Sequence, residues 1–310
     1  MVHGDFNGDG HEDFAVAWAF FPHTIEPSQK VNAPLNIYLN DGNGRFAEDL
    51  NIYAAEEAPT HPFAYRTIAA DFNNDGIDDI YCGSAFSVKE KGNNQRTHGG
   101  ADYVFISNGK GQWVRTAEKG DLVHKKHGVY LGFSHGITAA DIDNDGDIDV
   151  ITPHIKWENT KGGGKIYCHI NDGKGNFTVK WCADQFAHAV TTGDYNGDGH
   201  DDLLVGIGDW ADYGWDNAFN RQGLWTHGPL HGYVYLLLNQ ARTGKPVYAA
   251  PVPLQAGGKQ VDVFGMPSPN LADFDQDGDL DLLCGEFIDS LTYFENAGTR
   301  TQPRYKAGKL

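Results

Sequence analysis

The chain has 310 residues, of which 40% are hydrophobic and 12% aromatic. This suffices for one large β domain or two ordinary ones with a sizeable core, whereas the longest apolar run, Phe14 to Phe21, is too short to span a bilayer, so we expect no transmembrane segment. The formal net charge is −18, but 22 of the 42 acidic residues lie in five nine-residue segments without Lys or Arg, and the remainder is slightly positive. The acidity is therefore local and gives no reason to expect a basic partner. We also expect no nucleic-acid partner.

Five acidic segments share one pattern. They read DFNGDGHED (5–13), DFNNDGIDD (71–79), DIDNDGDID (141–149), DYNGDGHDD (194–202) and DFDQDGDLD (273–281), and we call them the acidic loops. Oxygen-bearing side chains occupy positions 1, 3, 5 and 9 of each, and Gly occupies position 6. Ca²⁺ takes several carboxylate oxygens, a backbone carbonyl at position 7 and a Gly for the sharp turn. We therefore predict up to five Ca²⁺ sites, with the side-chain ligands Asp5, Asn7, Asp9, Asp13, Asp71, Asn73, Asp75, Asp79, Asp141, Asp143, Asp145, Asp149, Asp194, Asn196, Asp198, Asp202, Asp273, Asp275, Asp277 and Asp281.

The acidic loops differ from EF-hand loops. An EF-hand closes with a bidentate Glu at position 12 and continues into a helix. Here the residues after each loop are apolar and strand-like, as in DLLVG and DLLCG, and position 12 is Val16, Cys82, Thr152, Val205 or Cys284. The pattern therefore predicts a calcium loop at the turn of a β-hairpin.

A second element recurs downstream of each acidic loop: a strand that enters a tight turn, usually rich in Asn and Gly. Its copies lie at 37–46, 104–113, 167–177, 235–248 and 292–305. Asn-Gly and Asn-Asp-Gly between alternating runs are strong hairpin signals. Each repeat therefore contains two hairpins, or four strands. Because no segment keeps a 3.6-residue apolar period, we expect few helices.

The recurrence of four antiparallel strands about every 65 residues predicts an all-β fold, a β-propeller whose four-stranded blades each carry a calcium loop. An array of β-sandwiches is the alternative, but about 100 residues per sandwich does not fit the 53-residue spacing between the third and fourth loops. We expect a single propeller domain over residues 1–310.

These motifs resemble a known family. The acidic loops, with Phe133 or Phe264-Gly265 upstream, resemble the FG-GAP repeats of integrin α-subunit heads and the related bacterial VCBS repeats, from Asp5 to about Tyr305. The resemblance implies a calcium-binding propeller, and similar propellers occur in adhesins, lectins and polysaccharide lyases. Family propellers usually have seven blades, whereas five repeats are visible here. The chain is then either a five-bladed ring or a piece of a larger one.

The end of each blade away from its acidic loop is where we expect a ligand. The start of the first strand and the end of the second must lie there, and the connectors that follow are rich in aromatic and charged residues, notably 208–231. Flat aromatic rings beside charged groups suit a sugar. The predicted ligand-binding residues are Trp18, His154, Lys156, Trp157, Asp209, Trp210 and Glu286.

Two functions fit this expectation. The first is a calcium-stabilised adhesin or lectin that binds a glycan or an extracellular protein. The second is a lyase that cleaves an acidic polysaccharide by β-elimination: His135 or His188 would abstract the proton α to the uronate carboxylate, Tyr65 would protonate the leaving oxygen, and Arg66 would neutralise the carboxylate. Binding is favoured because it requires only aromatic rings and hydrogen-bond donors, whereas the lyase requires a base, an acid and a cation close to one another.

The four cysteines predict no disulfide framework. Cys82 and Cys284 occupy the same strand position in two repeats, as small core residues do. Cys168 and Cys182 flank one hairpin, but its turn places Cys168 opposite about Val179. We therefore expect free thiols.

We expect an extracellular or periplasmic location, because modules of this kind usually require the high calcium found outside cells. Met1 lies four residues before the first acidic loop, which leaves no room for an export leader. We therefore expect that the native protein extends upstream.

Overall fold

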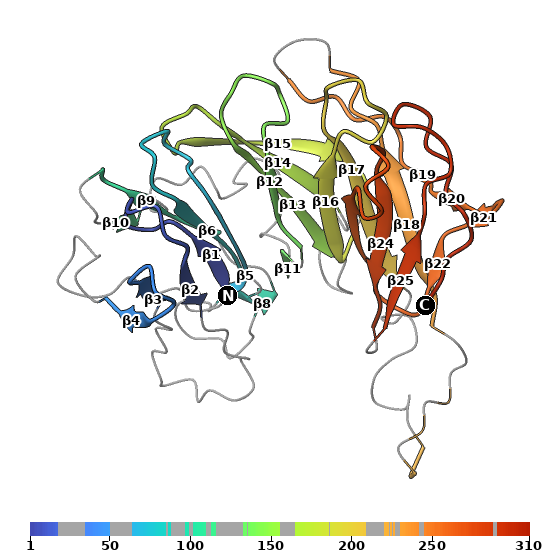
Figure 1. Ribbon diagram of the computed structural model, residues 1–310, viewed down its shortest axis with the longest axis horizontal. Coiled ribbons are helices and arrows are strands. Elements are labelled where there is room, and N and C mark those ends of the chain that lie inside the picture. The colour runs from blue at the N-terminus through green and yellow to red at the C-terminus, as the bar shows by residue number, and fades with distance from the viewer. Residues whose placement is uncertain are drawn as a thin grey trace. The chain divides into compact units, whose positions relative to one another are not determined.

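The computed structural model describes most of the repeats. The described residues are 1–17, 35–49, 64–84, 86–87, 97–98, 102–109, 113–115, 133–134, 136–155, 165–185, 187–208, 220–222, 224, 226, 230–241, 245–287 and 290–310. Their regular structure consists entirely of β-strands (Figure 1). Within these ranges there is no helix long and apolar enough to cross a membrane.

The chain forms two compact units. The first comprises residues 1–141 and 145–181, and the second comprises residues 142–144 and 182–310. That the two form one propeller domain stays a prediction.

The first unit contains three antiparallel sheets. The first has the order β1 (Val2–Gly4), β2 (Asp13–Ala17), β3 (Leu35–Asn40), β4 (Phe46–Glu48). The second has the order β5 (Ala64–Ala70), β6 (Asp79–Ser84), β9 (Tyr103–Ser107), β10 (Trp113–Arg115). In the third, β11 (Phe133–Ser134) and β12 (Thr138–Ala140) both pair with β13 (Asp149–Ile155), which is followed by β14 (Ile166–Asn171) and β15 (Phe177–Ala183). A short ribbon joins β7 (Phe86–Ser87) to β8 (Thr97–His98).

The second unit contains two larger sheets and a ribbon. The fourth sheet has the order β16 (Ala189–Gly193), β17 (Asp202–Gly208), β18 (Gly232–Leu237), β19 (Val252–Pro253), with β22 (Asp262–Val263) also on β18. The ribbon is β20 (Gln255–Ala256) with β21 (Lys259–Gln260). The fifth sheet has the order β23 (Ser268–Ala272), β24 (Asp281–Gly285), β25 (Leu291–Phe294). The C-terminal segment extends it, because Tyr293 and Lys309 exchange backbone hydrogen bonds of 2.8 and 2.9 Å.

The sheets pack through apolar faces, as propeller blades do. Phe6 and Phe72, at position 2 of their acidic loops, are fully buried. One cluster joins the first and second sheets through Phe6, Ile37, Ile80 and Phe105. Another joins the second and third sheets through Phe72, Tyr81, Val104 and Phe177.

Within each unit the first strands of successive sheets are neighbours: β5 lies beside β1 and β12, and β16 lies beside β23 (Figure 1). This arrangement places the first strand innermost in a blade. The prediction of an all-β fold built from β-propeller blades is confirmed.

One prediction about the cysteines is wrong. Cys168 and Cys182 are disulfide-bonded, whereas Cys82 and Cys284 are buried free thiols. The expectation of free thiols considered only residues directly opposite each other in the hairpin of β14 and β15. Side chains on a diagonal across an antiparallel pair also come within reach of each other.

Candidate metal centres

Each acidic loop connects the first two strands of its sheet. The residue before position 1 pairs with the Asp at position 9 in all five cases, in the pairs Gly4–Asp13, Ala70–Asp79, Ala140–Asp149, Gly193–Asp202 and Ala272–Asp281. The prediction of an acidic loop at a β-hairpin turn is therefore confirmed for every repeat.

The side chain of the Asp at position 1 accepts hydrogen bonds from the backbone of its own loop. In all five loops one carboxylate oxygen accepts the N–H of position 5 and the other accepts the N–H of position 6. For Asp71 these distances are 3.0 and 2.8 Å, and for Asp273 they are 3.0 and 3.1 Å. The Asp at position 5 in turn accepts the N–H of position 7, at 3.0 Å in the case of Asp75 and Ile77. These bonds hold the carboxylates at the loop interior before any cation arrives.

Two positions of each loop adopt left-handed backbone. Position 6, always Gly, has φ between 83° and 96°, where a side chain would be strained. Position 4 is also left-handed, and our sequence reasoning missed it: φ is 59° at Asn74, 58° at Asn144 and 63° at Gln276. The signal was present, because four of the five loops carry Gly or Asn at this position and both residues tolerate this conformation.

The Asp at position 9 braces the repeat as well as facing the loop. All five are at most 1% exposed. Its Oδ1 accepts a backbone N–H at or just after the end of the third strand, at 2.6 to 2.7 Å in every repeat; the donors are Asn40, Ser107, Asn171, Asn239 and Asn296. In four repeats Oδ2 accepts the N–H of position 2, as from Phe72 to Asp79 at 2.9 Å. One carboxylate thus connects the acidic loop, the second strand and the third strand of the repeat.

The Asn residues among those donors were missed by our sequence reasoning. Each uses its side-chain Nδ2 to donate to the backbone carbonyl at position 8 of its own loop, at 3.0 to 3.3 Å, in the pairs Asn40–Glu12, Asn171–Ile148, Asn239–Asp201 and Asn296–Leu280. Two also donate to the loop of the preceding repeat: Asn171 to Phe72 O at 2.8 Å and Asn239 to Ile142 O at 3.1 Å. An Asn at the same place in four hairpins was the available signal.

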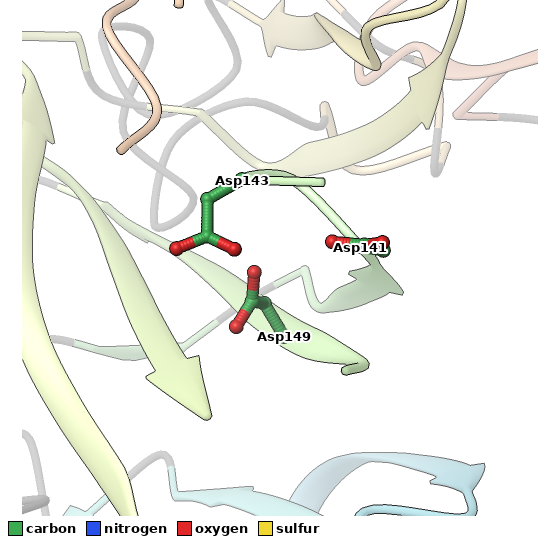
Figure 2. A group of neighbouring side chains, drawn as sticks. All are labelled: Asp141, Asp143 and Asp149. Atoms are coloured by element: carbon green, nitrogen blue, oxygen red, sulfur yellow. The ribbon is translucent and has the colours of Figure 1, made fainter. Parts of the chain in front are cut away.

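The predicted ligands converge in two of the loops. Carboxylate oxygens of Asp141, Asp143 and Asp149 lie within 4.8 Å of one another, and Figure 2 shows Asp143 and Asp149 facing each other with Asp141 beside them. In loop 273–281 the carboxylate oxygens that lie this close together belong to positions 1, 3 and 5: Asp273, Asp275 and Asp277. In the other three loops position 3 is an Asn, whose Oδ1 accepts the N–H of position 5, at 2.9 to 3.1 Å.

The electrostatics of these loops suit a hard cation. Burial raises the pKa of Asp79 to about 8 and that of Asp202 to about 6. Repulsion from neighbouring loop carboxylates adds to the rise, and the hydrogen bonds that each carboxylate accepts from backbone N–H groups oppose it. Burial also raises the pKa of Asp279, and repulsion from Asp277 adds to it. Oxygen donors at spacings of this kind are the ligands of Ca²⁺. The residues present therefore fit a divalent cation, which in loop 71–79 would replace the proton that burial favours on Asp79.

The residues predicted at the opposite strand ends are only partly described. Arg66 is exposed near the start of β5, and Glu286 follows β24 and accepts a hydrogen bond from the Thr292 hydroxyl. His188 precedes β16 and is 5% exposed, with its N–H bonded to Gly206 O at 2.8 Å. Tyr65 in β5 and His154 in β13 are described by their backbone alone.

Each of these residues lies at the end of its strand away from the acidic loop, as the pairings Ala64–Ser84 and Ser268–Gly285 require. The remaining predicted residues lie outside the described ranges: Trp18, His135, Lys156, Trp157, Asp209 and Trp210. That they share a surface stays a prediction.

Known proteins contain similar repeats. A family model described as an FG-GAP-like repeat matches residues 5–82, and one described as an FG-GAP repeat matches residues 186–216. Phosphatidylinositol-glycan-specific phospholipase D of Rattus norvegicus is 26% identical over 173 residues, which are 53% of this chain and 19% of that protein. The Mus musculus protein of the same name is 28% identical over 155 residues, 49% of this chain and 17% of that protein.

The matched stretch is thus less than a fifth of each curated relative. The two family matches contain three of the five acidic loops, and the same loop geometry recurs in the other two. The chain therefore contains FG-GAP repeats, matched at residues 5–82 and 186–216.

Proposed function

We propose that the chain is a calcium-stabilised β-propeller module that binds an extracellular protein or glycan. The observation that carries the calcium part is the fivefold recurrence of one loop geometry, with carboxylates at positions 1, 5 and 9. Ca²⁺ would be held by the side chains at positions 1, 3, 5 and 9 and the carbonyl at position 7 of each acidic loop. When bound, it supplies positive charge that offsets the mutual repulsion of these carboxylates.

The ligand face is proposed at the strand ends away from the acidic loops. The connectors attached there vary in length, and loops of this kind on a rigid scaffold are where binding residues concentrate. Arg66 and Glu286 are the described charged residues at this end, and the aromatic candidates Trp18, Trp157 and Trp210 belong to the connectors. A glycan is compatible with the names of the two curated relatives, which describe them as phosphatidylinositol-glycan-specific.

The lyase is the less favoured function. A general base must lie within hydrogen-bond reach of the proton that it abstracts, and His188, one of the two candidate bases, is buried. Among the described residues no observation favours β-elimination over binding.

An extracytoplasmic location fits the same proposal. Disulfides persist in oxidising compartments, and Cys168 and Cys182 are disulfide-bonded. Calcium of the concentration that extracellular modules use would keep the loops filled.

The decisive test has two arms. Isothermal titration of chelator-treated protein with Ca²⁺ tests the metal, and we expect binding that Asp75→Asn weakens. Incubation with a panel of acidic polysaccharides then separates binder from enzyme. A binder retains glycan or protein without change of absorbance, and Trp210→Ala weakens the retention. Ultraviolet absorbance from an unsaturated uronate, abolished by His135→Ala, would instead establish the lyase.

A further inference from the structure

The fourth acidic loop has a cationic side chain already seated on it. Arg300 lies in the turn between Thr299 and Gln302, which exchange backbone hydrogen bonds of 3.2 and 3.1 Å. Its Nη2 lies 3.1 Å from Oδ2 of Asp194, the position-1 carboxylate of loop 194–202. That same oxygen accepts the N–H of Gly199 at 3.1 Å. The carboxylate that Arg300 contacts is therefore the same one that accepts the backbone hydrogen bonds of the loop.

The segment that carries Arg300 packs closely against the loop, so the ion pair is part of a packed contact. A Cβ added at Gly197, position 4 of the loop, would lie 2.8 Å from the side chain of Thr301 and 3.3 Å from the carbonyl oxygen of Arg300. The turn between Thr299 and Gln302 thus packs directly against the loop, and a side chain at position 197 would clash with it. Arg300 Nη1 is buried and has no hydrogen-bond partner within the described ranges, so the carboxylate is the main anchor of the guanidinium.

The other loops lack this feature. The residues equivalent to Asp194 are Asp5, Asp71, Asp141 and Asp273. In the part of the chain that the structure describes, none of these four is paired with a Lys or Arg. The five loops therefore share carboxylates at positions 1, 5 and 9 but differ in local charge.

We propose that Arg300 is a resident cation of loop 194–202 and makes it the weakest divalent-cation site of the five. The inference rests on the proposed calcium binding. A cation bound to Asp194 would lie about 5 Å from the guanidinium, and even with water-like screening the repulsion of a single and a double charge at that distance lowers affinity on the order of tenfold. Filling this loop would therefore weaken the contact between Arg300 and Asp194 and loosen the turn at residues 299–302 from the loop.

The loop contains its own reporter. Tyr195, at position 2, is the single tyrosine within the five acidic loops. Tb³⁺ replaces Ca²⁺ as the probe, because a nearby tyrosine sensitises its luminescence. The difference in emission between the parent protein and Tyr195→Phe isolates loop 194–202, and Asp198→Asn, which removes a predicted ligand, should abolish that difference.

The variant that tests the proposal is Arg300→Gln. We expect the Tyr195-dependent signal to saturate at a Tb³⁺ concentration at least tenfold lower than in the parent, and at a nearly parental concentration in Arg300→Lys, which keeps the charge. Lys306→Gln is the matched control, since it removes the same charge from an ion pair with Glu295 outside the loops. It should leave the signal unchanged.

Thermal melts provide an independent reading. Arg300→Gln should lower the melting temperature in chelator, where the ion pair is lost, and raise it relative to the parent in saturating Ca²⁺, where the repulsion is lost. Unchanged or weaker Tb³⁺ binding in Arg300→Gln would overturn the proposal while leaving calcium binding intact. Absence of Tb³⁺ and Ca²⁺ binding to every loop would instead overturn the calcium function, and this proposal with it.

Discussion

The Tyr81 hydroxyl donates a 2.8 Å hydrogen bond to Asp102 Oδ2, and both side chains are buried, at 0% and 3% exposure. The same hydroxyl lies 3.3 Å from Nδ1 of His169, whose Nε2 lies 2.9 Å from the Thr152 hydroxyl. Tyr81 lies in β6 of the second sheet and Asp102 directly precedes β9 of the same sheet. His169 and Thr152 belong to the third sheet. A buried polar chain thus crosses the apolar interface between two blades.

This buried hydrogen-bond network should stabilise the first unit. Tyr81→Phe removes a donor from a buried carboxylate, which we expect to lower the free energy of unfolding by about 1–3 kcal/mol. Tyr38→Phe is the control: its ring stacks on Phe14 with centroids 4.7 Å apart, and we expect a change within about 0.5 kcal/mol. Urea unfolding of both variants measures the difference. Equal effects of the two substitutions would show that the network adds nothing to stability.

Calcium removal should destabilise the whole protein. Because the cation binds the folded loops, each site adds RT ln(1 + [L]/Kd) to stability, about 2.7 kcal/mol at a hundredfold excess over Kd. We expect EGTA to lower the melting temperature and added Ca²⁺ to restore it, whereas Mg²⁺, which demands a smaller octahedral site, restores less. A melting temperature that ignores chelation would show that the acidic loops contribute no metal-linked stability.

Positions 5 and 9 of a loop should respond differently to chelation. Asp79→Asn replaces an acceptor oxygen with an amide facing the N–H of Phe72 or Ser107, so it should cost about 1–3 kcal/mol even in EGTA. Asp75→Asn should destabilise mainly when Ca²⁺ is present, since Asp75 is exposed and keeps an acceptor oxygen after substitution. Melts of both variants with and without chelator make the comparison, and parallel behaviour would argue against the bracing role of position 9.

What the sequence predicted well is local. The acidic loops and hairpins are specified within about ten neighbouring residues, because ligand spacing and turn chemistry are short-range properties. The bond from Asn239 to Ile142 O and the contact between Tyr81 and His169 join residues 97 and 88 apart. Such partners depend on how sheets stack, which no local pattern contains. The disulfide between Cys168 and Cys182 lies within one hairpin, and it was missed because only directly opposite residues were considered.

The effect of pH should reverse between the bare and the calcium-loaded protein. Burial raises the pKa of Asp79 to about 8, above its ordinary value near 3.8. The folded bare loop therefore holds a proton that the unfolded chain releases, and this contribution to stability, complete below the ordinary pKa, is lost as pH rises toward about 8. Ca²⁺ requires the deprotonated carboxylate. Melts across this pH range should show the stabilisation by Ca²⁺ growing with pH. A calcium effect that shrinks with rising pH would contradict a protonated Asp79 in the bare loop.

The hairpin asparagines should differ according to whether they reach a neighbouring repeat. Asn239 is 3% exposed; its Nδ2 donates to Asp201 O and Ile142 O, and its Oδ1 accepts the N–H groups of Ala241 and Val247 at 3.0 and 3.4 Å. Asn40, more exposed, donates to its own loop at Glu12 O.

Asn239→Ala leaves buried backbone groups without partners, at about 1–3 kcal/mol each, so we expect a loss of at least 2 kcal/mol. Asn40→Ala, whose backbone partners can turn to water, should lose about 1 kcal/mol or less. Denaturant unfolding of both variants measures these losses, and hydrogen exchange of the Asp145 and Gly146 amides, which donate to Asp141 in the loop that Asn239 reaches, reports on that loop. Faster exchange at both residues in Asn239→Ala alone would show that one amide side chain couples successive acidic loops, whereas equal losses in the two variants would reduce its role to that of an ordinary turn residue.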